Sequence, residues 1–386
     1  MSNTAEKPQA NSIKPRLSFG EKVKLVGVLL FVAPWMLAIV GARFLSYALR
    51  NDLNIPLYLL NAGVRVLLGT FTAREIQTLL PSTEEAYGAW LRRKERLVKD
   101  STLRERLQCD IQPLPEVNSS ILWVGNRHKA RKVVLYLHGG GYVMPSQPGH
   151  FECAWNAFVL SGVESDTEVA VAFLQYSLTP AAKAPVQLRQ AASALCELLK
   201  AGFKPRDIVV GGDSAGGNVA MQLLHHIIEP HAEASRISLT EPLLAAFLVS
   251  PWLSCEVSSP SFLEHDGNDM LSIAIMRSLA VDAREHQEHI VSEEGGGWAE
   301  PLECQGAWLN KLDSAVKRLR ITVGGREVLA DQGKALAKTL EALKTGVQVT
   351  LECNPNAAHD LFVAEGILER IGEAAIEMKQ WFKSLL

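Results

Sequence analysis

Seven short runs of consecutive apolar residues constrain the fold of this chain more than any other feature. They are Ile121–Val124, Val133–Leu137, Val169–Tyr176, Ile208–Val210, Ala245–Ser250, Leu319–Val323 and Val347–Leu351. Strands that are apolar throughout, and not only at alternate residues, are typical of a parallel sheet covered on both faces. Stretches with helical periodicity separate the runs. This alternation predicts an α/β fold with a mostly parallel central sheet flanked by helices.

Four segments around these runs are expected to be helices. They are Pro185–Lys200, with Pro185 in its first turn, Ala215–Ile228, Gln332–Lys344 and Ala364–Leu386. Residues 255–317 break the alternation, because they form a long segment rich in Ser, Glu and Gly. We expect an inserted, partly helical lid there. The sequence therefore predicts one main domain over residues 106–386, with the lid inserted at residues 255–317.

The part of the chain before the first apolar run has no strand pattern. Residues 1–24 are polar and are expected to form a flexible tail. Leu25–Ala42 is uncharged over 18 residues and ends at Arg43. As a helix it would extend about 27 Å, which is the low end of a membrane span. Residues 43–105 are expected to be mostly helical, with an amphipathic stretch at Ile55–Phe71, and to contribute to the lid.

Three interpretations of Leu25–Ala42 stay open: a membrane anchor, a lid helix folded onto the main domain, and a signal peptide cleaved near Ala42. Five basic residues precede the run and two follow it closely, which predicts an anchor with its N-terminus in the cytosol. The main domain would then lie in the lumen of the endoplasmic reticulum, where the sequon at Asn118 could be glycosylated. A soluble cytoplasmic protein is the alternative.

The motif Gly211–Gly217 (GGDSAGG) directly follows a predicted strand and overlaps the start of the predicted helix Ala215–Ile228. A serine on a sharp turn between a strand and a helix is a nucleophile elbow. Small residues at Gly212 and Gly216 would avoid clashes in this strained turn, and the helix N-terminus supplies free N–H groups and a positive dipole end. Ser214 is therefore the predicted catalytic nucleophile.

A second glycine-rich motif, His138–Tyr142 (HGGGY), follows the second apolar run. Glycines let backbone N–H groups face a ligand without obstruction by a Cβ atom, and such donors stabilise the charge that develops on a carbonyl oxygen in acyl transfer. We expect Gly139, Gly140 and Ala215 to be these oxyanion donors. The motif lacks the G-x-G-x-x-G or Gly-Lys-Ser/Thr pattern of a phosphate-binding loop. His138 is expected to orient the loop by hydrogen bonding.

HGGGY and GDSAGGN, about seventy residues apart, together resemble the motifs of the hormone-sensitive-lipase family of α/β hydrolases. Gln175–Pro180 resembles that family's Tyr-Arg-Leu-Ala-Pro segment, with Ser177 and Thr179 in place of the usual Arg and Ala. The resemblance extends from Leu135 to the C-terminus, and it implies the α/β-hydrolase fold and serine esterase activity. The wording LQYSLTP and SPWLS resembles the branch of fungal sterol deacetylases and natural-product esterases.

The remaining catalytic residues follow from chain order, which in this fold is serine, acid, histidine. His359 is the one histidine of ten that follows the predicted lid, and its loop resembles the family's histidine loop. The family's Asp-Pro-Leu-x-Asp-x-Gly pattern aligns here on Leu329, Asp331 and Gly333. This alignment implies Glu327 as the catalytic acid, with Asp331 as the alternative.

The resemblance implies a carboxylic-ester hydrolase that uses Ser214, Glu327 and His359 on short-acyl esters of an apolar molecule such as a sterol or a polyketide. An acyltransferase or cyclase with the same triad is a second interpretation, and a non-catalytic small-molecule-binding protein is a third. A net charge of −3 gives no indication of a nucleic-acid partner, and no metal or organic cofactor is expected. Candidate lid residues facing the substrate are Trp252, Phe262, Met270 and Leu271.

Overall fold

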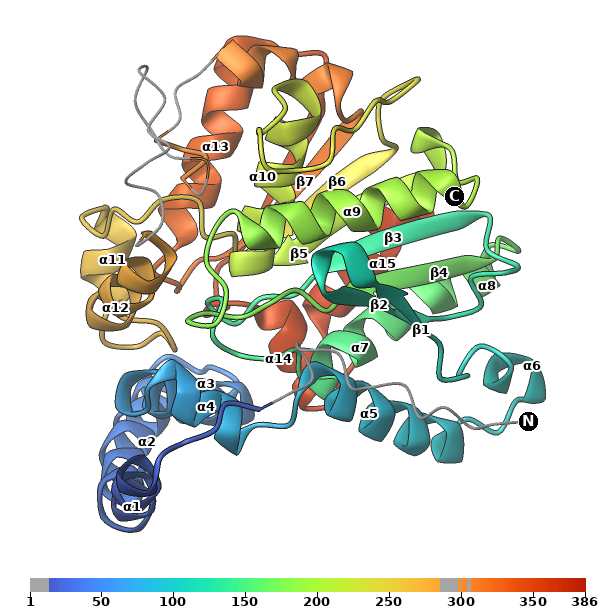
Figure 1. The fold of residues 1–386 in the computed structure, drawn as a ribbon. Coiled ribbons are helices and arrows are strands. Elements are labelled where there is room, and N and C mark those ends of the chain that lie inside the picture. Colours follow the sequence, from blue (N-terminus) through green and yellow to red (C-terminus); the bar gives the residue numbers. More distant parts are fainter. Residues whose placement is uncertain (1–13, 285–297, 299, 304–306) are drawn as a thin grey trace.

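The central sheet has eight strands in the order β1-β2-β4-β3-β5-β6-β7-β8 (Figure 1). The computed structural model describes residues 14–284, 298, 300–303 and 307–386. The strands are β1 (Ile111–Leu114), β2 (Ser119–Val124), β3 (Lys132–Leu137), β4 (Val169–Leu174), β5 (Ile208–Asp213), β6 (Ala245–Val249), β7 (Arg318–Gly324) and β8 (Gln348–Asn354). The β1–β2 and β2–β4 pairs are antiparallel and the others are parallel, so the predicted mostly parallel sheet is confirmed.

Strand β1 was not among the predicted strands. It has only four residues and contains Pro113, which cannot donate a hydrogen bond to a neighbouring strand. Proline is tolerated there because β1 forms one edge of the sheet. The predicted strands are central or long enough to show an apolar run, and β1 is neither.

The two faces of the sheet are covered by separate apolar cores, and β3 contributes to both. Val133, Leu135 and Leu137 belong to one cluster, while Val134 and Tyr136 belong to the other. Successive side chains of a strand point to opposite faces, so a strand that is apolar throughout supports both layers. Helices α9 (Val186–Lys200), α10 (Ala215–Ile228) and α13 (Ala330–Leu343) supply the first cluster, and α5 (Thr83–Leu97), α7 (Pro148–Ala154) and α15 (Glu373–Lys383) supply the second.

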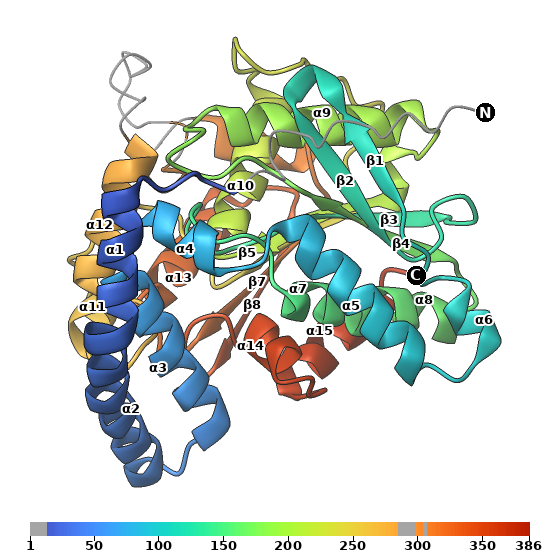
Figure 2. The same cartoon turned by 60° about the horizontal axis from the view of Figure 1, so that its bottom comes forward.

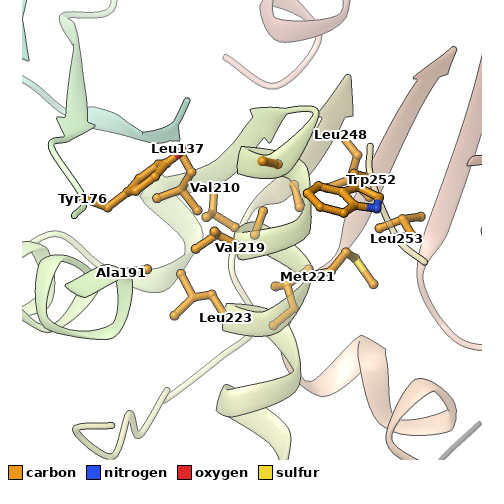
Figure 3. Close-up of a cluster of buried hydrophobic side chains, with 14 of the residues drawn as sticks. Leu137, Tyr176, Ala191, Val210, Val219, Met221, Leu223, Leu248, Trp252 and Leu253 are labelled. Carbon is orange, nitrogen blue, oxygen red and sulfur yellow. The ribbon is translucent and has the colours of Figure 1, made fainter. Parts of the chain in front are cut away.

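Helix α10 packs against the middle of the sheet and carries the predicted nucleophile at its start. Figure 3 shows Val219 and Leu223 of α10 on the side of Val210 and Ala191, and Met221 on the side of Leu253. All of these side chains are buried, and burying an aliphatic side chain of this size contributes about 1.5–3 kcal/mol. This packing holds the N-terminus of α10 at the carboxyl ends of the parallel strands.

The prediction of one helix over Ala364–Leu386 is wrong. The structure has two helices there, α14 (Leu361–Ile367) and α15. Glu369 adopts a left-handed conformation with φ of 53°, and Gly372 is extended as the N-cap of α15. Neither conformation continues an α-helix. The other predicted helices correspond to α9, α10 and α13, with small differences at their ends.

A long helix spans Phe19–Arg50 and includes the apolar run Leu25–Ala42. It consists of α1 (Phe19–Gly27), a π-helical turn η2 (Val28–Val32) and α2 (Ala33–Arg50). Pro34 has no N–H, and a π-turn just before such a residue lets the helix continue past the missing hydrogen bond. This helix is the one described element long and apolar enough to cross a membrane.

The predicted tail over residues 1–24 is wrong at its end, because α1 already begins at Phe19. Ser18 accepts a hydrogen bond from the Glu21 N–H and Glu21 accepts one from the Ser18 N–H, which forms a capping box. Residues 1–13 lie outside the described part of the chain. The charged residues before the apolar run therefore belong partly to the helix.

Both ends of this long helix are attached to the rest of the molecule. Near its start, Glu21 forms an ion pair with Arg74 at 2.9 Å. Near its end, Phe44 and Ala48 are buried against α3 (Ile55–Thr70). Figures 1 and 2 both show α1–α3 at one side of the sheet, next to α11 (Pro260–His265) and α12 (Ile273–Arg284). The remaining described helices are α4 (Ala73–Leu79), α6 (Ser101–Arg104), α8 (Leu160–Glu164), π-helical η4 (Trp155–Val159), and the 3₁₀ turns η3 (Pro115–Val117), η5 (Pro205–Asp207) and η7 (Ala307–Ser314).

Candidate active site

Ser214 lies on a strained turn between β5 and α10. Its backbone has φ of 50° and ψ of −117°, a region that non-glycine residues rarely adopt. A Cβ atom on Gly212 would lie 2.0 Å from the Leu137 carbonyl oxygen, and one on Gly216 would lie 1.9 Å from the same atom. Only glycine fits at these two positions, which is the reason expected from the sequence. The turn lifts the Ser214 side chain above the ends of the strands.

His359 and Glu327 lie in line with Ser214. The His359 Nε2 atom is 3.0 Å from Ser214 Oγ, and the Nδ1 atom is 3.0 Å from Glu327 Oε2. His359 follows β8 and Glu327 follows β7, so the three side chains come from three loops at the same edge of the sheet. Asp331 is elsewhere, because its Oδ2 atom accepts a hydrogen bond from the Ser261 N–H at 2.9 Å. The structure thus brings Ser214, His359 and Glu327 together and leaves Asp331 outside.

The charge state of His359 reflects two opposing effects. Burial by itself would lower the pKa of His359, but the hydrogen bond to Glu327 and the negative charge of that carboxylate raise it above its ordinary value. A buried imidazole with a carboxylate partner is prepared to accept and hold a proton. This arrangement suits a general base that takes the proton from a serine hydroxyl.

The prediction that Gly139 is an oxyanion donor is wrong. Its N–H donates to Asp213 Oδ2 at 2.8 Å, so it is not available to a ligand. Gly140 and Gly141 line the pocket in front of Ser214. Among the described residues, no protein acceptor takes the N–H groups of Gly140, Gly141 or Ala215. The third glycine of the HGGG motif was the available sequence signal for Gly141.

Asp213 and His138 hold this glycine loop in place. Asp213 accepts hydrogen bonds from the Tyr136 hydroxyl and the Gly139 N–H. His138 Nδ1 lies 2.7 Å from the Gly139 carbonyl oxygen, and its ring stacks on Tyr176 at 4.2 Å. Burial lowers the pKa of His138 to about 4, which keeps it neutral. The predicted role of His138 in orienting the loop agrees with these contacts.

Asp269 is a buried carboxylate beside the triad that the sequence analysis did not single out. Its Oδ1 atom accepts from the His359 N–H at 3.1 Å, and its Oδ2 atom accepts from the Val328 N–H at 2.9 Å. Burial raises the pKa of Asp269 to about 6. Asp269 therefore joins the predicted lid segment to the two loops that carry His359 and Glu327. No local sequence pattern marks such a residue, because its partners lie far away in the chain.

The triad opens into an apolar pocket with about 690 Å³ of space between its atoms, open solvent included. Three of the four predicted lid residues, Trp252, Met270 and Leu271, line it. Phe262 does not line it and is fully buried in the core. Helix α12 also contributes Met276 and Leu279, and α3 contributes Leu60, Val64 and Leu68. Among the described residues, no group of three or more His, Cys, Asp or Glu side chains is placed to hold a metal ion.

Residues 134–363 match the model of the alpha/beta hydrolase fold family. An acetyl-hydrolase of Streptomyces hygroscopicus is 28% identical over 239 residues, which cover 61% of this chain and 70% of that protein. An ethyl acetate hydrolase of Pseudomonas putida is 26% identical over 252 residues, which cover 64% and 71%. Both alignments fall within the range expected of distant relatives that share a fold and its motifs.

Solved structures show the same architecture. An esterase from the bacterial hormone-sensitive lipase family superimposes with a TM-score of 0.59 at 20% identity, over 86% of this chain and 97% of the other. A carboxyl esterase from the fungus Tuber melanosporum has a TM-score of 0.59 at 21% identity, over 72% of this chain and 86% of the other. With the family match and the paired glycine motifs, these findings establish that the chain belongs to the alpha/beta hydrolase fold family, in its hormone-sensitive-lipase group of esterases.

Proposed function

We propose that this enzyme hydrolyses carboxylic esters through a covalent acyl-enzyme formed on Ser214. The observation that carries the proposal is the continuous line from Ser214 Oγ through His359 to Glu327, with 3.0 Å at each step. His359 Nε2 takes the hydroxyl proton as Ser214 attacks the ester carbonyl carbon, and then gives this proton to the departing alkoxide. Glu327 accepts a hydrogen bond from His359 Nδ1 and stabilises the imidazolium.

The second half of the reaction uses the same groups in reverse. His359 removes a proton from a water molecule, which attacks the acyl-enzyme and releases the carboxylic acid. In both halves, the N–H groups of Gly140, Gly141 and Ala215 would donate to the oxyanion. Each such donor contributes about 3–4 kcal/mol to transition-state stabilisation in related chemistry.

For the substrate, we propose a short acyl group on a larger apolar alcohol. The pocket is apolar apart from the catalytic groups, and the two relatives described above are named for acetyl-ester hydrolysis. A sterol or polyketide acetate, suggested by the resemblance to the fungal deacetylase branch, belongs to this class. Product analysis in the presence of a second alcohol separates hydrolysis from acyl transfer, because a transferase would form a new ester.

The test of the proposed reaction is Ser214→Ala. We expect hydrolysis of p-nitrophenyl acetate to fall to the small residual rate that the oxyanion donors alone support, with the circular dichroism spectrum unchanged. A fluorophosphonate should label Ser214 in the unmodified protein and label no serine in the variant. Undiminished hydrolysis by a folded Ser214→Ala protein would exclude the proposed mechanism, and would also leave open the non-catalytic binding function.

We further propose that the enzyme associates with membranes through the helix Phe19–Arg50. Phe31 is 77% exposed and Trp35 is 68% exposed, and the apolar window of this helix is only 6% buried. A large exposed apolar surface is typical of a membrane or protein interface. The ion pair of Glu21 with Arg74 supports a helix that lies along the bilayer surface. The finer prediction, a crossing helix with the catalytic domain in the lumen of the endoplasmic reticulum, stays a prediction.

A further inference from the structure

A second apolar chamber continues from the active-site pocket beneath helix α3. It has about 1460 Å³ of space between its atoms, open solvent included. Five residues line both spaces: Leu60, Val64, Met144, Gln147 and Ile367. The two are therefore adjoining compartments along one side of α3.

The chamber is lined mainly by apolar side chains that the catalytic mechanism does not use. Leu67 lies on α3, Leu80 follows α4, and Trp90 lies on α5. Charged residues, among them Arg93 and Glu369, also line it, and these two form an ion pair with each other. A compartment with this lining accommodates a large apolar group and has no need of a charged ligand.

The chamber also reaches the long N-terminal helix. Leu37 of α2 and Leu59 of α3 both line it, and they are 49% and 42% exposed. These two side chains therefore border both the chamber and the outer surface. The surface at this point is the exposed apolar face of Phe19–Arg50.

A lipid bilayer is the occupant that fits this face. The apolar part of the helix is bounded by Lys22 and Lys24 on one side and by Arg43 and Arg50 on the other, and all four are exposed. A row of apolar side chains between basic residues is the pattern of helices that insert into a leaflet and bind anionic head groups. The mouth of the chamber would then face the hydrocarbon part of the leaflet.

We propose that this chamber binds the large apolar part of the substrate, and that the substrate enters it from the lipid bilayer between α2 and α3. The inference rests on the proposed esterase function and extends it to the substrate class, an ester that partitions into lipid. The ester group would lie at Ser214 in the first pocket, and the apolar part would extend under α3. Short water-soluble esters would occupy the first pocket alone.

Gly63 provides a selective test, because it lines the chamber and not the active-site pocket. A Cβ atom at Gly63 would have no neighbour within 4 Å, so Gly63→Leu fills the chamber without displacing other atoms. It also replaces a poor helix former by a good one, which favours folding. The matched control is Gly69→Leu on the same helix, where a Cβ atom would make ordinary contacts with Ile275 at 3.7 Å and the chamber is not involved.

The readout is kcat/KM on two series of esters, p-nitrophenyl esters from acetate to laurate and acetates of alcohols of increasing length. Gly63→Leu should lower kcat/KM for the long members of one series by about tenfold or more, because lost apolar contacts act on the transition state. The acetate with the short alcohol should keep its rate, and Gly69→Leu should match the unmodified protein in both series. Unchanged chain-length profiles in both series would overturn the chamber. Loss of all activity in Ser214→Ala tests the proposed reaction separately.

Entry from lipid is tested with the full chain and vesicles of phosphatidylcholine that contain phosphatidylserine. Leu59→Glu puts a charge at the mouth and should lower hydrolysis of a lipophilic acetate held in these vesicles by about tenfold, since a charge is excluded from hydrocarbon. Hydrolysis of dissolved p-nitrophenyl acetate should not change. Leu97→Glu, at an exposed leucine of α5 that does not line the chamber, is the control. An equal vesicle rate for Leu59→Glu and the control would overturn the proposed route.

Discussion

Glu327 and Asp331 are close in the sequence but have opposite surroundings. Glu327 is fully buried, and its Oε1 atom accepts from the Gly324 N–H at 3.0 Å while Oε2 faces His359. Asp331 lies in the first turn of α13, where a carboxylate interacts favourably with the helix dipole. One residue can therefore act in catalysis, and the other contributes to the start of a helix.

The two carboxylates should respond differently to neutralisation. Glu327→Gln should lower kcat by roughly three to four orders of magnitude, because the imidazolium loses its partner charge. Asp331→Asn should leave kcat almost unchanged and lower the unfolding temperature slightly. Steady-state kinetics on p-nitrophenyl acetate and a thermal melt distinguish the two. Similar losses of kcat in both variants would contradict the assignment of Glu327.

The pH profile provides a second measurement on the same variant. His359 acts as a base only when neutral, so activity falls as the pH drops through its pKa, which the Glu327 carboxylate raises. In Glu327→Gln this raising effect is gone and burial alone lowers the pKa. The acid limb of the residual kcat/KM profile should therefore move to lower pH.

At the scale of elements, the catalytic loops depend on a segment inserted between β6 and β7. Asp269, from this segment, accepts N–H groups from the loop after β7 and the loop after β8. Arg65 of α3 in turn donates to the Asp269 carbonyl oxygen at 2.7 Å. The N-terminal helices, the inserted segment and the catalytic loops are thus joined through one buried carboxylate.

Asp269→Ala should affect both stability and catalysis. It leaves buried N–H groups of Val328 and His359 without an acceptor, which costs about 1–3 kcal/mol for each group. We expect a lower unfolding free energy in urea and a lower kcat, because the backbone at His359 loses its support. Asp266→Ala is the control: Asp266 Oδ1 accepts from the Ile273 N–H at the start of α12, away from the triad. A kcat reduced equally in both variants would mean that general destabilisation is the cause.

At the scale of the whole molecule, the contacts at both ends of Phe19–Arg50 bear on how the enzyme meets a membrane. A helix that crosses a bilayer separates its ends by the hydrocarbon thickness of about 30 Å. The Glu21–Arg74 ion pair instead joins the start of the helix to α4, on the same side as the catalytic domain. A helix that lies in the interfacial plane keeps this contact and still inserts its apolar face.

Glycosylation at Asn118 distinguishes the two arrangements. A crossing helix places the catalytic domain in the lumen, where the exposed Asn118 would be modified, whereas a helix on the cytosolic surface leaves it unmodified. From the ion pair we expect membrane-bound protein with no shift on endoglycosidase treatment in eukaryotic cells. A shift that Asn118→Gln removes would instead establish the luminal arrangement. Phe31→Asp with Trp35→Asp should release the protein from the membrane fraction.

The sequence by itself determined the features whose physical cause lies within a few consecutive residues. Continuous apolar runs predicted the central strands, because a strand buried on both faces has no polar positions. The small residues around Ser214 predicted the elbow, and the Leu329–Gly333 pattern located Glu327 beside it in chain order. The membrane-length run was equally visible, although its length alone gave no orientation.

Only the tertiary structure decided which groups are free and which are occupied. Gly139 and Gly140 are neighbours in one motif, yet the Gly139 N–H is taken by Asp213, which lies 74 residues further along the chain. Asp269 is 90 residues from His359, and no local pattern marks their contact. The chamber under α3 likewise exists only where helices from distant segments meet. Hydrogen bonds and cavities depend on which partners are brought together in space, and short-range sequence patterns do not contain that information.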